Sequence, residues 1–381
     1  PFTSKISWKP ELIEYIRELF NEFYKSIKAD SAYIRFFFMT GCVRLSNLSI
    51  FSAMNNLYDI SMDRRFAGAF GYTERELEDN FGEGMDEYLE ANPGVYGSKE
   101  EFIGRIRDYY DGYRFSPRSD IKVYNPVSIG RFFDSLDCIF ENYWELTGVS
   151  TMAVELARRY DLLSLVDEMP SLDLEAFTSF DISLLAEKKL RVNDIYALLY
   201  YAGYLTIKKA GETSIRLGYP NREISISFTR ALIKQYMEQG FGSLTDDLGE
   251  AMDRCDVDAM AAIFNRYLAM FPYHFYERKD ERLFHTMMHG LFVCMKGDAY
   301  PEDAGKLGRA DEVLIRGNHI YIFELKVDGS AEEALQQIKE RHYADKYIHM
   351  AEEKGMKIIL VGISFSSSER CIAEWKSDPL C

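Results

Sequence analysis

Two acidic residues and a lysine near the C-terminal end of the sequence have the types and spacing of a site that could hold a divalent cation. They are Asp311, Glu324 and Lys326, in the stretch GRADEVLIRGNHIYIFELK that starts at Gly308. Carboxylate oxygens are the side-chain ligands that hard divalent cations prefer. A nearby ammonium group could stabilise negative charge on a substrate. The three side chains can act together only if the fold brings them to one place.

A predicted β-hairpin brings these side chains to one face. Residues 311–315 and 319–326 are rich in β-branched and aromatic types, and Gly317 with Asn318 favours a tight turn between them. The predicted cross-strand pairs are Arg316 with His319, Ile315 with Ile320, Val313 with Ile322 and Asp311 with Glu324. Because side chains alternate between the two faces of a strand, Asp311, Glu324 and Lys326 share a face.

The predicted pairing of Asp311 with Glu324 needs a compensating interaction. Like charges directly opposite each other destabilise a sheet, and removing them from water costs more. A divalent cation held by both carboxylates, with Lys326 nearby, would compensate for the repulsion. The alternative is that the strand ends are exposed and all three charges are simply solvated. The local pattern leaves both interpretations open.

The composition describes a folded protein with a strong negative charge. The chain has 381 residues, enough for two or three domains, and is 47% hydrophobic and 14% aromatic, as globular proteins are. Its formal net charge of −16 argues against a broad nucleic-acid-binding surface, because phosphate affinity comes mainly from Lys and Arg. A local basic groove is still compatible with this charge.

The cysteines and the hydropathy pattern indicate a cytoplasmic protein. The six cysteines are widely scattered, without a CxxC pair or zinc-ligand spacing, so we expect reduced structural thiols. No apolar run approaches the ~20 residues that span a bilayer. No signal peptide opens the chain, and we expect no contact with a membrane.

The first third of the sequence predicts helices around one buried strand. Residues 10–27 have the 3.6-residue periodicity of an amphipathic helix. Residues 33–39 form a nearly continuous apolar run, typical of a strand that is buried on both faces of a parallel sheet. Thr40 follows, where such a sheet places its functional loop. Thr73 and Glu76 have the spacing of a capping box and predict the start of another helix.

The middle third is predicted to be mostly helical, with a small group of strands. Strands are predicted at residues 204–207, 214–217 and 223–228. Helices followed by such a β-wing indicate a winged-helix-like module, which can bind DNA or mediate other contacts. The sequence shows no basic recognition helix here.

The last unit is predicted as helix, short strand, hairpin, helix and strand, after a long helical stretch at residues 244–270. Its first helix carries His285 and His289, which are four residues apart and could share a metal. No acid accompanies them as in an HExxH motif, so we expect them to face the core or the helix surface. Ser330 and Glu333 form a capping box at the start of the second helix.

This order of elements resembles the core of the PD-(D/E)XK nuclease superfamily. Asp311 corresponds to the first acid, and Glu324, Leu325 and Lys326 match the second acid, the spacer and the lysine. The resemblance implies a restriction-endonuclease-like αβββαβ domain at the C-terminal end. Glu-x-Lys alone is a weak signal, and the register that places Asp311 opposite Glu324 strengthens it.

The whole chain resembles a bacterial family that joins an AAA-ATPase-like domain to a C-terminal PD-(D/E)XK nuclease-like domain. The motifs that carry this resemblance are Thr40-Gly41, Ser49-Ile50-Phe51, Asn55-Asn56-Leu57, Tyr110-Asp111-Gly112-Tyr113, Asn125-Pro126, Tyr204-Leu205-Thr206-Ile207, Gly308-Arg309 with Asp311, and Phe323-Glu324-Leu325-Lys326. It implies a mixed, helix-rich α/β protein. Residues 1–143 would be the rear of an ATPase-like α/β core with a helical lid, 144–240 a helical, winged-helix-like region and 241–381 the nuclease-like domain.

One departure from the family concerns ATP. Its members have a P-loop and an acidic magnesium-binding strand near the N-terminus, but this sequence contains no GxxxxGK[ST] and is expected to begin after both. Thr40 matches the position where such ATPases sense the γ-phosphate. We therefore expect no ATP hydrolysis by this chain alone.

The resemblance implies metal-dependent hydrolysis of phosphodiester bonds in nucleic acid, with DNA favoured over RNA. Asp311, Glu324 and the carbonyl of Leu325 would hold Mg²⁺ or Mn²⁺, and Glu302 could join them. Lys326 would orient the attacking water or stabilise charge in the transition state. The sequence predicts no particular oligomeric state.

Three further residues are expected to contact nucleic acid. Gln337 and Tyr343 resemble the Gln and Tyr that related nucleases place on the helix after Glu-x-Lys, although the spacing is not a clean match. Arg309, opposite Lys326 in the predicted register, could contact a phosphate or balance the charge of Glu324.

Three rival interpretations remain open. The domain could bind nucleic acid or protein without cutting, although the presence of both acids and the lysine counts against this. The chain could be a nucleotide-driven switch in which the ATPase-like part controls the nuclease-like part, which would need an N-terminal segment that this sequence lacks. It could also be an interaction module whose acidic cluster is only a solvated strand end.

Overall fold

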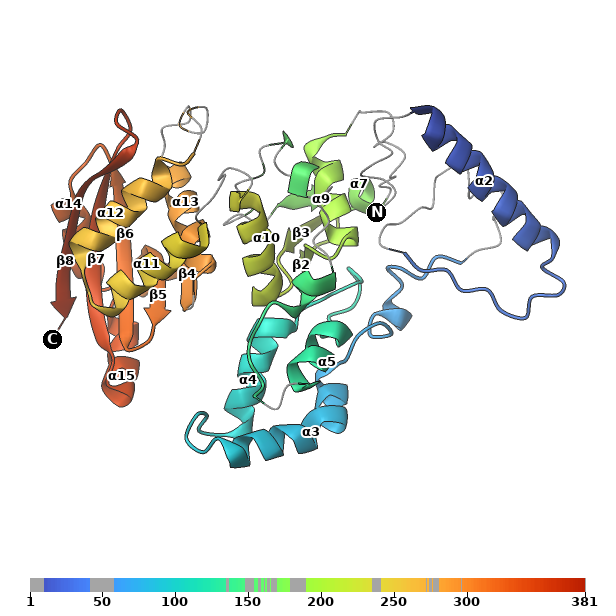
Figure 1. Cartoon of the computed structure of the whole chain (residues 1–381), viewed down its shortest axis with the longest axis horizontal. Helices are drawn as coiled ribbons and strands as arrows, with labels where there is room; N and C mark the ends of the chain where they lie inside the picture. The colour runs from blue at the N-terminus through green and yellow to red at the C-terminus, as the bar shows by residue number, and fades with distance from the viewer. Residues whose placement is uncertain are drawn as a thin grey trace. The chain divides into compact units, whose positions relative to one another are not determined.

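A computed structural model gives the architecture of the chain (Figure 1). It describes residues 10–41, 58–134, 137–147, 154–156, 159–160, 162, 165, 170–178, 190–234, 241–271, 273, 276, 281–295 and 297–380. None of the helices among these residues is long and apolar enough to cross a lipid bilayer.

The chain divides into two compact units. Pro1–Leu162 and Glu168–Phe228 form the N-terminal unit, and Leu163–Asp167 and Thr229–Cys381 form the C-terminal unit. The C-terminal unit contains Asp311, Glu324 and Lys326. The three-part division into residues 1–143, 144–240 and 241–381 stays a prediction.

The N-terminal unit contains helices and a small antiparallel sheet. Its elements are α2 (Pro10–Ala29), η1 (Arg64–Phe66), α3 (Glu74–Ala91), α4 (Lys99–Tyr110), α5 (Pro126–Asp134), η2 (Tyr143–Thr147), β1 (Ser171–Asp173), α7 (Leu174–Thr178), α9 (Val192–Tyr201), β2 (Thr206–Ala210), β3 (Ser214–Gly218) and the first part of α10 (Arg222–Lys234). The three strands lie in the order β1-β3-β2. The predicted capping box is confirmed, because Glu76 N donates to Thr73 Oγ1 and Thr73 N donates to Glu76 Oε2.

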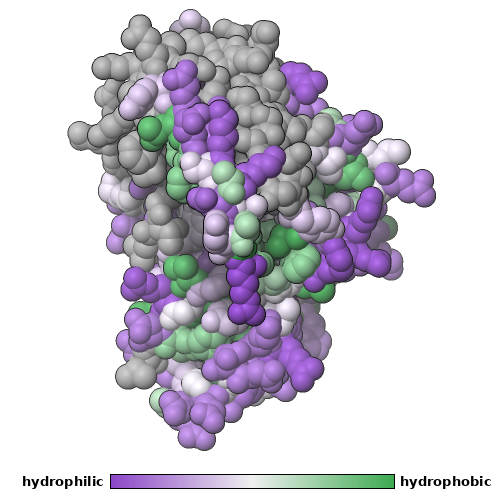
Figure 2. All heavy atoms as spheres, turned by 90° about the vertical axis from the view of Figure 1, so that its right-hand side faces the viewer, coloured by the Kyte–Doolittle hydropathy of each residue, from purple (hydrophilic) through white to green (hydrophobic). Residues whose placement is uncertain are grey.

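The predicted strand at residues 33–39 is wrong. This segment forms turns and irregular chain, and the side chains of Tyr33 and Phe36 are 90% and 79% exposed. An apolar run becomes a buried strand only where neighbouring strands pair with its backbone N–H and C=O groups. Within the described ranges, no strand pairs with it. Figure 2, which views the molecule from the right-hand side of Figure 1, shows hydrophobic residues scattered among hydrophilic ones.

The third strand of the predicted β-wing is also wrong. Residues 223–228 belong to helix α10, and β1 is the third strand of the small sheet. The Ile-Ser-Ile-Ser alternation has the period of a strand, but Ile224, Phe228 and Leu232 repeat at the spacing of a helix and are all buried. The side chain of Asn221 accepts a hydrogen bond from Ile224 N and stabilises the first turn. Two of the predicted strands are confirmed as β2 and β3, and the winged-helix comparison stays a prediction.

The long helical stretch predicted at residues 244–270 is two helices, α11 (Phe241–Asp253) and α12 (Val257–Leu268). Cys255 between them has a left-handed φ of +54°. The side chain of Asp256 accepts a hydrogen bond from Ala259 N and caps α12. This cap ends one helix and starts the next, because Asp favours the N-cap position over a helix interior.

A five-stranded sheet forms the centre of the C-terminal unit. Its elements follow in the order α13 (Glu281–Val293), β4 (Asp298–Ala304), β5 (Arg309–Arg316), β6 (His319–Val327), α14 (Ala331–Glu340), α15 (Asp345–Lys354), β7 (Lys357–Ser366) and β8 (Cys371–Leu380). The strands lie in sequence order, and β6 and β7 are parallel while the other neighbours are antiparallel. This order contains the predicted helix, short strand, hairpin, helix and strand, with α15 and β8 in addition.

Helices cover both faces of this sheet. Leu314, Tyr321 and Phe323 point to the face that packs against α11, α12 and α13, two of which cross in front of the strands in Figure 1. Val313 and Ile322 point to the other face, where α14 and α15 pack. Residue parity along β5 and β6 therefore decides which helices a side chain meets.

The hairpin has the register that the sequence predicts. The strands pair Arg316 with His319, Ile315 with Ile320, Leu314 with Tyr321, Val313 with Ile322 and Glu312 with Phe323. Gly317 in the turn has a φ of +52°, which glycine adopts at little cost. The backbone pairing of β5 with β6 ends at Glu312 and Phe323, so Asp311 and Glu324 lie one residue beyond the last pair.

Candidate active site

Asp311 forms a side-chain link between the two strands at the end of the hairpin. Its Oδ2 atom accepts a hydrogen bond of 2.7 Å from the backbone N–H of Leu325. This bond lies directly beyond the last backbone pair of the ladder, Glu312 with Phe323. The carboxylate of Asp311 is therefore fixed against β6, next to Glu324.

Glu324 is a buried carboxylate with one bonded and one unbonded oxygen. Glu324 is 2% exposed. Its Oε1 atom accepts hydrogen bonds from Lys326 Nζ at 3.1 Å and from Gln337 Nε2. Oε2 is buried without a hydrogen-bond partner among the described residues. Burial raises the pKa of Glu324 to about 7, and the negative charge of Asp311 adds to the shift while Lys326 opposes it. Buried carboxyls with few partners commonly titrate this high.

Lys326 is a partly buried cation among several acids. Burial alone would lower the pKa of Lys326, but the charges of Glu324, Glu281 and Asp311 outweigh burial and raise it. Lys326 therefore stays charged at neutral pH, with its ammonium group directed at Glu324.

Glu281, which the sequence analysis did not select, belongs to this cluster. It begins α13, and burial raises its pKa, while Lys326 opposes the shift and the charge of Asp311 adds to it. These electrostatic interactions indicate that Glu281 lies near both residues. The only sequence signal is an acid in the first turn of the helix that precedes the sheet, and acids are common at that position in any helix.

Helix α14 supplies the remaining contacts of Glu324. Gln337 donates through Nε2 to Glu324 Oε1, and the same nitrogen lies 3.4 Å from Tyr343 Oη. Tyr343 is buried and packs against Gly308, where an added Cβ would lie 3.1 Å from Tyr343 Cε1. Gln337 on α14 therefore contacts Glu324 directly, whereas Tyr343 lies beyond the end of α14 and contacts Gln337. The roles of both residues stay predictions.

The other predicted site residues are Arg309, Leu325 and Glu302. Arg309 begins β5, is exposed, and pairs with Ala304 of β4. Leu325 contributes its backbone N–H to Asp311. Glu302 lies on β4, but its side chain is outside the part of the chain that is described.

A second acid faces the opposite side of the sheet, directly after Asp311. Glu312 is fully buried, and its Oε2 accepts a hydrogen bond of 2.9 Å from His289 Nδ1 and lies 3.6 Å from His285 Nε2. Burial alone would raise the pKa of Glu312, but the two histidines outweigh it and lower the pKa. His285 Nε2 also lies 2.7 Å from the backbone carbonyl of Asp311, to which it can donate.

The sequence left the core and the helix surface open for His285 and His289, and the structure places both in the core, since both are buried. The sequence analysis missed their acidic partner because Glu312 comes from a different element, 23 residues beyond His289. Throughout the described ranges, no group of three or more His, Cys, Asp or Glu side chains could hold a metal ion. Glu312, His285 and His289 interact with one another on the face of the sheet that packs against α13.

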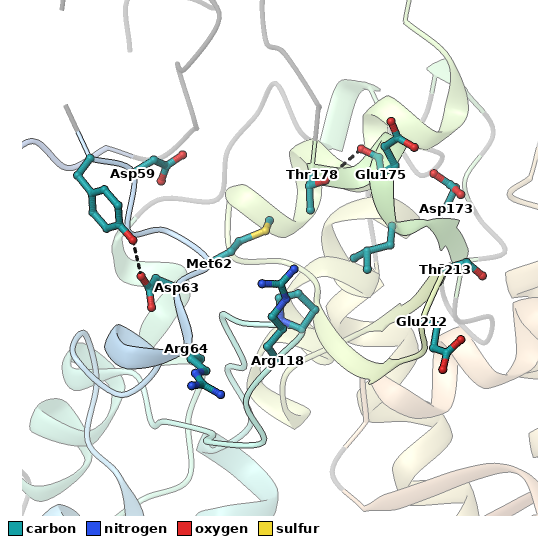
Figure 3. A pocket seen from close by; sticks show the side chains of 13 residues that line it. Asp59, Met62, Asp63, Arg64, Arg118, Asp173, Glu175, Thr178, Glu212 and Thr213 are labelled. Carbon is teal, nitrogen blue, oxygen red and sulfur yellow. Dashed lines mark hydrogen bonds between the residues drawn. The ribbon is translucent and has the colours of Figure 1, made fainter. Parts of the chain in front are cut away.

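The N-terminal unit has a separate cavity of about 900 Å³ (Figure 3). Acidic and basic side chains from four segments line it: Asp59, Asp63, Arg64, Arg118, Asp173, Glu175 and Glu212. It shares no residue with the cluster around Glu324, so the two are distinct features.

Comparisons with known proteins agree with the geometry of the C-terminal unit. Residues 279–375, which include Asp311, Glu324 and Lys326, match the PD-(D/E)XK nuclease superfamily. The chain is 30% identical over 379 residues to a protein of Azotobacter chroococcum mcd 1, described as an uncharacterized protein in the vnfD 5′ region. The match covers 96% of this chain and 67% of that protein. No solved structure matches the chain.

The C-terminal unit therefore contains a domain of the PD-(D/E)XK nuclease superfamily, and the whole chain belongs to the same family as the Azotobacter protein. This superfamily is associated with nuclease-type hydrolysis of phosphodiester bonds. The ATPase-like resemblance of the N-terminal unit has no counterpart in these matches.

Proposed function

We propose that the C-terminal unit hydrolyses phosphodiester bonds in nucleic acid, with DNA favoured over RNA, and that it does so with Mg²⁺ or Mn²⁺. The observation that carries this proposal is the joining of three side chains at one strand end. Asp311 is bonded to Leu325 N at 2.7 Å, and Glu324 Oε1 is 3.1 Å from Lys326 Nζ.

The donor set suits a small hard cation. The buried Oε2 of Glu324 has no hydrogen-bond partner among the described residues, and Asp311 helps to raise the pKa of Glu324 to about 7. A divalent cation held by both carboxylates would favour their ionised forms. Mg²⁺ commonly binds through one or two carboxylates and completes its shell with water and phosphate oxygens. Asp311, Glu324 and the carbonyl of Leu325 would hold it, with Glu302 as a further candidate, and the cation would supply Lewis acidity to the scissile phosphate.

The chain's own residues would position the reacting groups. Lys326 is held by Glu324 and would donate a hydrogen bond to the attacking water or to a phosphate oxygen. Gln337 holds the Glu324 carboxylate from α14, and the Leu325 N–H holds that of Asp311. Glu281 adds negative charge that keeps Lys326 protonated. These contacts fix the orientation of both acids before substrate arrives.

Cleavage assays with matched variants test this proposal. The protein is incubated with single- and double-stranded DNA and RNA in Mg²⁺, Mn²⁺ or EDTA. We expect metal-dependent cleavage that Asp311→Asn and Lys326→Met abolish. Lys357→Met is the control, because Lys357 is exposed and pairs with His319 at the far end of β6. A parallel thermal-unfolding experiment should show stabilisation by Mg²⁺ in the wild type and less in Asp311→Asn.

Two outcomes would contradict the proposal. Absence of cleavage with every substrate, together with no effect of Mg²⁺ or Mn²⁺ on thermal unfolding, would exclude a metal-dependent nuclease. Metal-independent binding of nucleic acid without cleavage would indicate a non-cutting binding module of the same fold.

For the N-terminal unit we propose that it is the remaining part of an ATPase-like regulatory module. The support is the sequence resemblance around Thr40 and Tyr110 to Tyr113, without a P-loop in this sequence. We expect this chain alone neither to hydrolyse ATP nor to gain thermal stability from it. Hydrolysis of ATP by the purified chain would overturn this proposal.

A further inference from the structure

The loop between β4 and β5 is held in place by two basic side chains from the segment that joins α14 to α15. Gly305 N donates to Gly308 O at 2.7 Å and closes the loop on itself. Lys346 Nζ donates to Ala304 O at 2.9 Å, and Arg341 Nη1 donates to Leu307 O at 3.3 Å. Both cations come from the segment where α14 ends and α15 begins. They hold the loop through its backbone carbonyls.

This loop is physically continuous with the proposed active site. Gln337 contacts both Glu324 and Tyr343, and Tyr343 packs on Gly308 at the end of the loop. Because β5 and β6 are antiparallel, the start of β5 at Arg309 lies at the same end of the sheet as Lys326. A nucleic acid whose scissile phosphate lies at Lys326 would therefore have the loop beside it, at the same end of the sheet.

The charges at this edge differ from those of the whole chain. Lys306 and Arg309 are exposed on the loop and at its end, and together with Arg341 and Lys346 they form what we call the basic rim. The nearby acid Asp303 is engaged by Lys346 at 2.5 Å and by Tyr347 Oη at 2.8 Å. Glu340 bonds to Gln336, and Asp345 lies 3.6 Å from His342. Four cations therefore face three acids at this edge, Asp303, Glu340 and Asp345, and leave a small positive excess in a chain with a formal net charge of −16.

We propose that the basic rim binds the backbone phosphates that flank the scissile bond, independently of base sequence. This inference rests on the proposed nuclease function and adds the surface that holds the substrate. Lys306 and Arg309 would contact phosphates directly. Arg341 and Lys346 would keep the loop ordered, so that little conformational entropy is lost on binding. Exposed Lys and Arg supply most of the affinity of proteins for a phosphate backbone, and they release counterions on binding.

Equilibrium binding without cleavage tests this surface separately from catalysis. Fluorescence anisotropy is measured in EDTA, over a range of salt concentrations, with a labelled DNA duplex and a labelled single strand of the same sequence. The variants are Lys306→Gln and the double variant Lys306→Gln with Arg309→Gln. Arg341 and Lys346 are left intact because they hold loop carbonyls. The control is Lys357→Gln, which also removes one positive charge. Lys357 pairs with His319, which lies seven residues, or ~23 Å, along β6 from Lys326.

We expect each removed charge to weaken binding about tenfold near 0.1 M salt and to lower the slope of log affinity against log salt by about one. The control variant should bind like the wild type, and all variants should unfold at the wild-type temperature. Unchanged affinity and salt slope in the double variant would overturn the proposal. Equal weakening by the control would also overturn it, as would equally effective competition by poly-glutamate, which would indicate an acidic protein partner. Because the assay detects binding in EDTA, a chain that binds here but never cuts would refute only the proposed hydrolysis.

Discussion

Glu324 lies directly opposite Gly362 in the parallel β6–β7 ladder, and the missing side chain at Gly362 allows α14 to approach Glu324. A Cβ at Gly362 would lie 2.1 Å from Ala331 O and 2.7 Å from Leu335 N, both in the backbone of α14. Backbone atoms cannot rotate away as a flexible side chain can. The distance between α14 and the sheet, and with it the contact of Gln337 with Glu324, therefore depends on this glycine.

Gly362→Ala is expected to destabilise the C-terminal unit by about 1–3 kcal/mol, because overpacking forces the helix backbone to move. Urea denaturation measures the change. The control is Gly242→Ala in α11, where an added Cβ meets nothing within 4 Å. That substitution should be neutral or slightly stabilising, since Ala favours a helix over Gly. Equal stability of the two variants would show that α14 does not need this close approach.

Gln337→Leu is expected to reduce the rate of cleavage by about 10- to 100-fold, because residues that orient the ligands of a metal site typically contribute this much. The matched control is Gln336→Leu, since Gln336 is the neighbouring exposed residue and bonds to Glu340 on the same helix. Steady-state kinetics distinguish an effect on the chemical step from one on binding. Equal activity of the two variants would exclude a positioning role for Gln337.

The titration of Glu324 predicts a decrease in stability as pH rises in the absence of divalent cations. Burial and the charge of Asp311 raise its folded pKa to about 7 from 4.5, so the folded state holds this proton more tightly than the unfolded state. Stability from this group is fully present below pH 4.5 and is lost as pH rises through 7. The loss should reach about 3 kcal/mol.

Urea denaturation in EDTA at pH 5 and pH 8 measures most of this loss, and Glu324→Gln is the reference. The reference is needed because burial also raises the pKa of Glu223, in the N-terminal unit, to about 7. The difference between wild type and Glu324→Gln isolates the contribution of Glu324. The same pH dependence in both proteins would contradict the raised pKa.

Replacement of His289 should distinguish the donor it supplies from the space it fills. His289→Leu removes the N–H at 2.9 Å from the fully buried Glu312, and breaking such a pair typically costs about 3–5 kcal/mol. His289→Asn keeps an N–H near the position of Nδ1 and should lose much less. Denaturation curves of the two variants provide the test. Similar losses would mean that the shape of the imidazole matters and its hydrogen bond does not.

The sequence predicted the hairpin well because its signals are local. Strand alternation and the turn at Gly317 determine which of Asp311 and Glu312 faces which side, and the observed pairs up to Glu312 with Phe323 follow the predicted register. The electrostatic interactions of Glu281 and the contacts of Glu312 could not be predicted in the same way. They depend on how α13 packs against the sheet, which sequence spacing does not encode.

The two wrong strands have a common physical origin. An apolar run at residues 33–39 and an alternating run at residues 223–228 satisfy the pattern of a strand, but a strand also needs a partner for its backbone. The first run has none among the described strands, and the second forms a helix whose apolar stripe is buried. Pattern alone cannot decide between these outcomes, because pairing is a property of the whole fold.

The adjacent acids Asp311 and Glu312 place one negative charge on each face of the sheet. The carboxylate of Asp311 bonds to the backbone of β6 at the strand end, and that of Glu312 is enclosed with two histidines. A slip of one residue in the β5–β6 register would exchange the two environments. It would place the longer acid at the strand end and the shorter one beyond easy reach of the imidazoles. The turn at Gly317 therefore determines more than the geometry of a loop, because the register it sets decides which of the two carboxylates shares a face with Glu324.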